Sequence, residues 1–125
     1  MSLGLYIHVP FCQTKCAYCD FASVAGRADL FAAYTLAVCD ELRRRPGLEG
    51  EETSKTPDVS SVYVGGGTPS VLPAALLTRI LQAAATAFRI ALDAEVTVEV
   101  NPGTVDAAAL AGLRDAGVNR LSIGV

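Results

Sequence analysis

The fold is indicated most directly by residues 3–21, LGLYIHVPFCQTKCAYCDF, where an alternating apolar stretch runs into three closely spaced cysteines. Leu5, Ile7 and Val9 are separated by single residues, which predicts a strand over residues 3–9 with one apolar face. The cysteines follow without a helical segment in between. We therefore expect them in a loop at the C-terminal end of the first strand.

Three more strands and three helices are predicted along the chain. The predicted strands are residues 3–9, 61–64, 95–100 and 120–125, and the predicted helices are 29–45, 73–88 and 104–117. Asp29 and Thr104 suit helix N-caps, and Pro73 suits a first turn. Pro46-Gly47 is expected to end the first helix, and the polar segment 47–60 to form a surface loop. The order β-α-β-α-β-α-β predicts an α/β fold with a parallel sheet.

The predicted strands alternate, whereas strands buried on both faces read as unbroken apolar runs. The apolar face is expected to carry Val96, Val98, Val100, Leu121 and Ile123, and the polar face Tyr6, His8, Thr97, Glu99 and Ser122. One face would pack on helices, and the other needs something to bind its polar groups. This pattern fits a barrel or partial barrel with a ligand in its lumen. Because three and a half βα units do not close a barrel, we expect residues 1–125 to be the N-terminal part of a longer protein.

Two further motifs lie at the C-terminal strand ends, where active sites of parallel α/β barrels collect. Gly65-Gly66-Gly67-Thr68-Pro69-Ser70 follows the second strand, and Glu99-x-Asn101-Pro102-Gly103 closes the third. The glycines would let backbone amides approach a ligand, although a tight turn also uses glycine. No Gly-Lys-Ser/Thr follows, which excludes a phosphate loop. Glu99 would bind an amine or a ribose hydroxyl, or else be a solvated carboxylate.

The spacing Cys12-x3-Cys16-x2-Cys19 indicates a metal centre. Iron–sulfur clusters commonly take four cysteines, so three would leave one iron open to an external ligand. Structural zinc also needs a fourth ligand, for which His8 is available. The spacing alone leaves both metals open. Cys39, in the middle of the first predicted helix, is expected to be a small buried residue.

Composition excludes several classes of protein. The chain is 51% apolar and 18% charged, which excludes a disordered chain. Its net charge is −3, and its basic residues are scattered apart from Arg43-Arg44-Arg45, so no nucleic-acid partner is expected. No apolar run reaches the roughly 18 residues of a membrane span. The apolar start lacks the basic region and cleavage site of a secretory signal, which predicts a cytoplasmic location.

Taken together, the motifs closely resemble one family. They are residues 6–21, Gly65-Gly66-Gly67-Thr68-Pro69-Ser70, Glu99-x-Asn101-Pro102-Gly103 and residues 119–125. The resemblance is to the radical S-adenosylmethionine (SAM) group that contains oxygen-independent coproporphyrinogen III oxidases and HemW-type haem chaperones. It implies a partial (β/α)6 barrel followed by a C-terminal domain, of which residues 1–125 would be the N-terminal part of the radical SAM core.

The resemblance also implies cofactors and their ligands. Cys12, Cys16 and Cys19 would hold a 4Fe-4S cluster, whose open iron would bind the amino and carboxylate groups of SAM. The implied SAM contacts are Tyr6, Tyr18, Gly66, Gly67, Thr68 and Glu99. In the family the reduced cluster delivers an electron to the sulfonium, which forms a 5′-deoxyadenosyl radical. No residue of the chain is expected to act as a catalytic acid or base.

Position 21 separates the two branches of the resemblance. The oxidases carry a fourth cysteine two residues after the last ligand, whereas this chain has Phe21. That departure implies the chaperone branch, which binds haem and passes it to an acceptor protein. The alternative within the family is a coproporphyrinogen-decarboxylating oxidase, acting on a porphyrin precursor. The alternative from another class is a zinc-stabilised binding module without redox chemistry.

Overall fold

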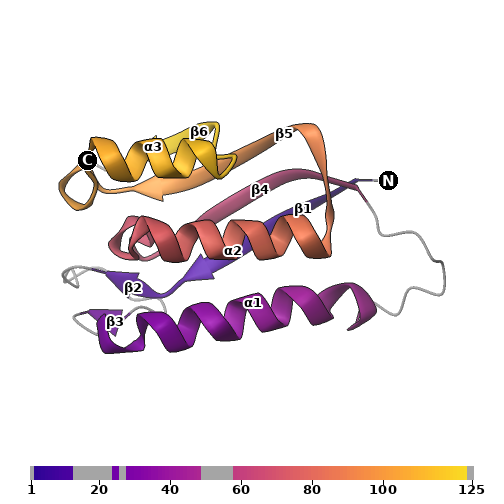
Figure 1. Ribbon diagram of the computed structural model, residues 1–125, viewed down its shortest axis with the longest axis horizontal. Helices are drawn as coiled ribbons and strands as arrows, with labels where there is room; N and C mark the ends of the chain where they lie inside the picture. Colours follow the sequence, from indigo (N-terminus) through magenta and orange to yellow (C-terminus); the bar gives the residue numbers. More distant parts are fainter. Residues whose placement is uncertain (1, 13–23, 26–27, 49–57, 124–125) are drawn as a thin grey trace.

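The computed structural model describes residues 2–12, 24–25, 28–48 and 58–123 of the 125-residue chain. Its main feature is a parallel four-stranded sheet in the order β1-β4-β5-β6 (Figure 1). The strands are β1 (Ser2–Val9), β4 (Asp58–Gly66), β5 (Arg89–Val100) and β6 (Arg120–Ile123). The α/β class and the parallel sheet predicted from the sequence are confirmed.

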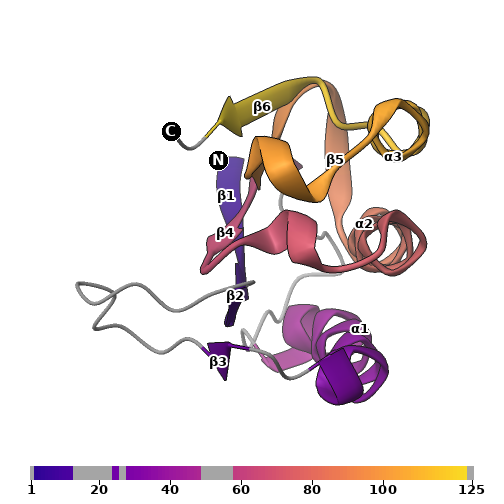
Figure 2. The same ribbon diagram turned by 90° about the vertical axis from the view of Figure 1, so that its left-hand side faces the viewer.

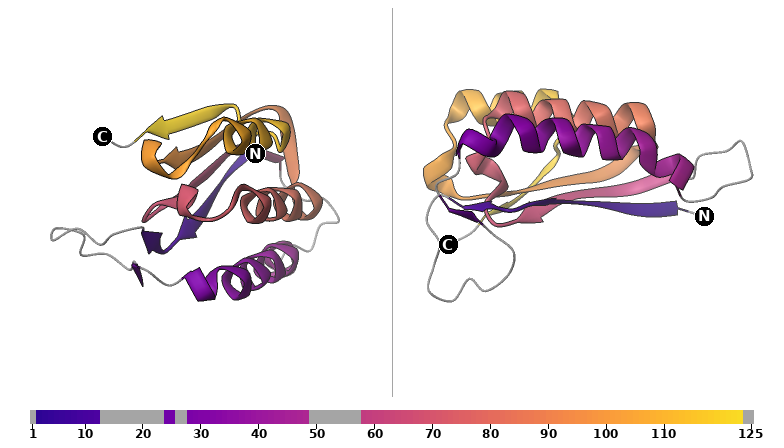
Figure 3. Two further views of the ribbon diagram at one scale, coloured as in Figure 1. Left: turned by 60° about the vertical axis from the view of Figure 1, so that its left-hand side comes forward. Right: turned by 90° about the horizontal axis from the view of Figure 1, so that it is seen from below.

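Three helices form a layer over one face of this sheet. They are α1 (Phe31–Leu48), α2 (Ala74–Ala87) and α3 (Ala107–Asp115), and each connects two neighbouring strands of the sheet. Figure 2 and the right-hand view of Figure 3 show the helices together on one side and the opposite face of the sheet free of helices. The strands therefore have a covered face and an uncovered face, hereafter the helix face and the inner face.

The core lies between the helix face and the helices, as the alternation predicts. Val9, Val64 and Val98 of three adjacent strands are fully buried, and so is Ile80 of α2. Burying a side chain of this size stabilises the fold by about 1.5–3 kcal/mol. Periodic apolar residues therefore explain why the helices pack on this side of the sheet.

The helix boundaries differ from the predictions in small ways. A 3-10 turn (Ala28–Leu30) precedes α1, so Asp29 lies before the helix rather than at its cap. The helix also continues through Pro46 to Leu48, three residues beyond the predicted end. Pro73 directly precedes the first residue of α2.

The third helix is shorter than the predicted 104–117, since it runs from Ala107 to Asp115, and Gly117 follows its end. Asp106, not Thr104, is its N-cap, because the Asp106 carboxylate accepts a 2.8 Å hydrogen bond from the Ala109 amide. At the other end Gly117 has φ +109°, and the Val118 amide donates to the Leu113 carbonyl at 3.0 Å. This is the Schellman arrangement, which favours glycine at that position.

Two strands begin several residues earlier than predicted. β4 begins at Asp58, within the predicted loop, and β5 begins at Arg89 rather than at residue 95. Asp58 pairs with Arg89, after which β5 takes three more residues than β4 before the register resumes. Leu92 is fully exposed in this irregular stretch. The sequence at the start of β5 does not alternate between apolar and polar residues. The pattern therefore predicted only the part of the strand from residue 95 onward.

The outer edge at β6 corrects one expectation. Leu121 and Ile123 were expected on a packed face, yet they are 37% and 59% exposed. β6 is the last strand of the described sheet and pairs only with β5, so these side chains have no neighbouring strand on their outer side. On the neighbouring helix α3, Leu113 is buried and Leu110 is half-buried.

Candidate functional site

The register of the parallel strands brings the glycine motif and Glu99 to one edge of the sheet. His8 and Val9 at the end of β1 pair with Gly65 and Gly66 at the end of β4. Glu99 near the end of β5 pairs with Ser122 of β6. The C-terminal strand ends therefore bring the glycine motif and Glu99 to the same edge as the end of β1, whereas most of the cysteine motif lies outside the described residues.

The glycine motif is tied to the backbone that leads toward the cysteines. Gly67 donates its amide hydrogen to the Val9 carbonyl at 2.8 Å, and Thr68 donates to the Phe11 carbonyl at 2.6 Å. Gly66 has φ +118°, and a Cβ there would lie 2.5 Å from the Val9 oxygen. Gly66 is thus required by a close approach within the chain itself. The sequence indicated a close approach but did not identify this partner.

The same motif also binds Glu99, whose carboxylate is held at both oxygens. The Gly66 amide donates to Oε1 at 3.0 Å, and the Tyr63 hydroxyl donates to Oε2 at 2.7 Å. The hydrogen bond to this carboxylate raises the pKa of Tyr63 above its usual value. Tyr63 did not stand out in the sequence, because it is one alternating residue of an ordinary strand.

Aromatic side chains continue the inner face beyond Glu99. The rings of Tyr6 and Tyr63 stack with centroids 6.0 Å apart and an interplanar angle of 19°. The Tyr6 hydroxyl lies 3.1 Å from Nδ1 of His8. Tyr6 is 56% exposed, and desolvation, followed by the charge of Glu99, raises its pKa. Tyr6 thus lies on the inner face, next to the residue that holds Glu99.

The loop after β5 is joined to the glycine motif by a second contact. The Asn101 amide donates to the hydroxyl oxygen of buried Ser70 at 3.1 Å. The side-chain oxygen of Asn101 accepts from the Gly103 amide, which closes the turn into a 3-10 segment (Pro102–Thr104). Hydrogen bonds therefore link the end of β1, the glycine motif and the loop after β5 into one rim.

A small hollow of about 180 Å³ opens on this rim. Its lining residues are Gly67, Thr68, Glu99, Val100, Asn101 and Ser122. The hollow thus gathers three of the residues implied as SAM contacts. Tyr6 and Gly66 lie on the same edge but outside this lining. Tyr18, the remaining implied contact, lies outside the described residues.

The cysteine segment is bracketed by a short strand pair. β2 (Phe11–Cys12) pairs with β3 (Val24–Ala25), and the intervening residues 13–23, with Cys16, Cys19 and Phe21, lie outside the described part. For Cys12 only the backbone is described. Within the described ranges, no three His, Cys, Asp or Glu side chains come together as a metal site. The cluster ligands therefore stay predictions.

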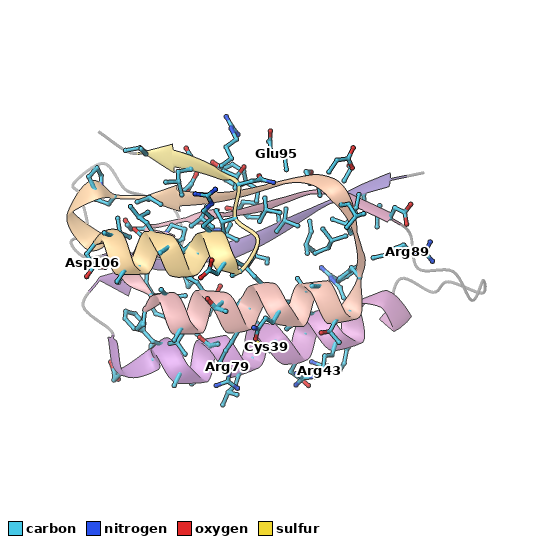
Figure 4. All side chains as sticks on the ribbon, turned by 45° about the horizontal axis from the view of Figure 1, so that its top comes forward. Cys39, Arg43, Arg79, Arg89, Glu95 and Asp106 are labelled. Carbon is cyan, nitrogen blue, oxygen red and sulfur yellow. The ribbon has the colours of Figure 1, made fainter. Side chains whose placement is uncertain are left out.

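Contacts from α1 hold the end of β1 and the start of β2, which lead to the cysteine segment. The Tyr34 hydroxyl donates to the His8 carbonyl, and its ring packs edge-on against Phe11 with centroids 5.3 Å apart. Cys39, also on α1, is buried at the contact with α2, with its sulfur 3.7 Å from the Arg79 carbonyl. Figure 4 shows Cys39 and Arg79 among the helices, away from the strand ends. Cys39 is a buried core residue, as expected.

Residues 6–125 match the family model described as the Radical SAM superfamily. The chain is 40% identical over 131 residues to the heme chaperone HemW of Synechocystis, which covers 100% of this chain and 30% of that protein. It is 39% identical to the heme chaperone HemW of Escherichia coli, over 98% of this chain and 32% of that one. The chain thus spans about a third of the length of these relatives.

A solved structure, described as coproporphyrinogen III oxidase (HemN) from Escherichia coli, a radical SAM enzyme, has the same fold. It superposes with a TM-score of 0.85 at 33% identity, covering 99% of this chain and 28% of that one. The partial-barrel fold implied by the sequence motifs is therefore confirmed. In the described part of the chain, no helix is both long and apolar enough to cross a membrane.

Proposed function

Because the chain belongs to the radical SAM superfamily, we propose that it forms the cluster- and SAM-binding part of a HemW-type haem chaperone. The observation that carries the proposal is the hydrogen-bonded rim at the C-terminal strand ends, centred on Glu99. This rim joins polar groups of the glycine motif and of the Glu99 motif to the end of β1. The family implies SAM and a 4Fe-4S cluster as the groups it serves.

In this proposal Cys12, Cys16 and Cys19 hold the 4Fe-4S cluster. The β2–β3 pairing supports the assignment, since it brings the two ends of the cysteine-bearing segment together beside the rim. The Gly67 and Thr68 amides support it too, because they hold the backbone just before Cys12 in place. When bound, the cluster supplies an electron for SAM cleavage. The contribution of the chain is to hold the two cofactors together and to exclude water.

Tyr6, Tyr18, Gly66, Gly67, Thr68 and Glu99 are proposed to contact SAM. The Glu99 carboxylate suits part of such a ligand. It has lone pairs left after its two hydrogen bonds, so it can accept further hydrogen bonds from an ammonium group or a ribose hydroxyl. Glu99 lines the hollow beside Thr68 and Ser122. The exposed ring of Tyr6 offers a flat apolar surface on the same inner face.

The chaperone role is preferred over the oxidase because of Phe21, which takes the place of the fourth cysteine of the oxidase pattern. A phenylalanine side chain neither ligates metal nor donates a hydrogen bond. The heme chaperones are 32–40% identical to the chain and an oxygen-independent coproporphyrinogen III oxidase is 35% identical, so the preference depends on Phe21 and not on overall identity. We further propose that residues 1–125 are the N-terminal part of the core domain of a longer, cytoplasmic protein with a haem-acceptor partner.

Anaerobic reconstitution with iron and sulfide tests the cluster. We expect the visible and EPR signals of a 4Fe-4S cluster, and we expect Cys12→Ala, Cys16→Ala and Cys19→Ala each to abolish them. Cys39→Ala is the matched control, because Cys39 is buried between helices, and it should keep the signals. Stoichiometric zinc with no iron–sulfur signal would favour the zinc-stabilised module instead.

A second assay separates the chaperone from the oxidase. The reconstituted full-length protein is incubated with coproporphyrinogen III and SAM, and separately titrated with haem. Stoichiometric haem binding without decarboxylation is expected. Turnover to protoporphyrinogen would overturn the chaperone role and favour the oxidase.

A further inference from the structure

Tyr63 of β4 lies on the inner face between Tyr6 of β1 and Glu99 of β5, two residues proposed to contact SAM. Its hydroxyl donates to Oε2 of Glu99 at 2.7 Å, and its ring stacks on Tyr6. It does not itself line the hollow on the rim. We propose that Tyr63 is a positioning residue, which orients the Glu99 carboxylate for ligand binding; this inference rests on the proposed SAM site.

The geometry around Glu99 shows why Tyr63 matters. A glutamate side chain has three rotatable bonds, so one contact would leave its carboxylate free to turn. The Gly66 amide holds Oε1 and the Tyr63 hydroxyl holds Oε2, on opposite oxygens of the same group. Two contacts therefore fix both the position and the plane of the carboxylate before a ligand arrives.

Gly65 provides the space for this arrangement. A Cβ on Gly65 would lie 2.8 Å from Cε1 of Tyr63 and 3.1 Å from Cδ and Oε1 of Glu99. Its φ does not lie in the positive region, so the backbone itself accepts a side chain there. The first glycine of the motif is therefore required by the Tyr63–Glu99 pair and not by a turn.

Orientation before binding affects affinity directly. A carboxylate that is already fixed loses little side-chain freedom when it accepts hydrogen bonds from a ligand. Without the Tyr63 hydroxyl, the ligand itself must order Glu99. Because ordering a flexible side chain on binding lowers affinity, we expect a loss of about tenfold in SAM affinity.

The test measures SAM dissociation constants by anaerobic calorimetry on reconstituted Tyr63→Phe, Glu99→Ala and the double variant, with SAM titrated to millimolar concentration. Tyr63→Phe should weaken binding about tenfold in the native background and less than about twofold in the Glu99→Ala background. Thr35→Val is the matched control: it removes a buried hydroxyl from α1, far from the inner face, and should leave affinity unchanged.

Gly65→Ala gives an independent variant, because its methyl group displaces the Tyr63–Glu99 pair without changing either residue. We expect a similar loss of SAM affinity, whereas Gly4→Ala, at a strand glycine whose Cβ would meet only the Ser61 hydroxyl, should bind normally. Unchanged affinity in Tyr63→Phe, or an equal loss with and without Glu99, would overturn the inference while the SAM site stands. A native protein with an intact cluster that binds no SAM would overturn the SAM site as well.

Discussion

The two faces of the sheet are built from alternate residues of the same strands, yet different forces stabilise them. On the helix face Val9, Val64 and Val98 are fully buried among apolar side chains. On the inner face the Glu99 carboxylate accepts directional hydrogen bonds from the Tyr63 hydroxyl and the Gly66 amide near the strand ends. The comparison indicates that the helix face provides stability and the inner face provides the site. Mutations on the helix face should therefore lower the free energy of unfolding, and mutations on the inner face should mainly lower ligand affinity.

The largest expected effect is on the helix face. Ile80→Ala removes a fully buried side chain of α2 and leaves a cavity, so it should lower the free energy of unfolding by about 2–5 kcal/mol. Urea unfolding followed by circular dichroism measures it. Leu36→Ala, at an exposed position on α1, is the control and should change stability by less than about 0.5 kcal/mol. Equal effects would contradict the assignment of the core to this face.

Gly66→Ala tests the close approach between the end of β4 and the end of β1. The new Cβ would clash with the Val9 carbonyl at a positive φ, so we expect a loss of about 2–4 kcal/mol in unfolding free energy. Gly117→Ala is matched, since Gly117 has a similar φ of +109° but a Cβ there would meet no described atom within 4 Å. Its cost should be about 1 kcal/mol, from backbone strain alone. If both variants lost the same amount, the Val9 contact would not be what requires Gly66.

Asp106→Ala is expected to have a smaller effect, because it removes only a helix cap. Loss of the hydrogen bond to the Ala109 amide should destabilise the protein by about 1 kcal/mol, measured by thermal unfolding. Thr104→Ala, at the position that the sequence favoured as N-cap, should leave the melting temperature unchanged. The reverse result would restore the sequence-based boundary of α3.

The smallest expected effect is a pH dependence from the inner face. The pKa of Tyr63 is raised because its hydroxyl donates to Glu99. A group with a raised pKa in the folded state contributes stability below its unfolded pKa, about 10 for tyrosine, and loses it as pH rises further. The unfolding free energy should therefore fall more steeply above pH 10 in the native protein than in Tyr63→Phe. Identical pH profiles would show that the hydrogen bond contributes no stability.

The sequence by itself determined the parallel α/β architecture, the helix face and the edge that carries the motifs. Alternation along Leu5, Ile7 and Val9 is a local property, and burial of apolar side chains is non-directional, so periodicity is enough to locate the core. The right-handed βαβ connections then place successive strand ends at one edge. The resemblance of the motifs to radical SAM proteins identified the family without any contact being known.

Only the tertiary structure decided how the rim is assembled. The Tyr63–Glu99 contact joins residues 36 positions apart in the sequence, and the Gly66–Val9 approach joins two strand ends. Neither contact has a periodic signal, because hydrogen bonds depend on the register and separation of neighbouring strands. The position of β6 at the edge of the described sheet likewise depends on which strands pair. Ile123 is therefore exposed, although it is apolar and follows the alternation of its strand.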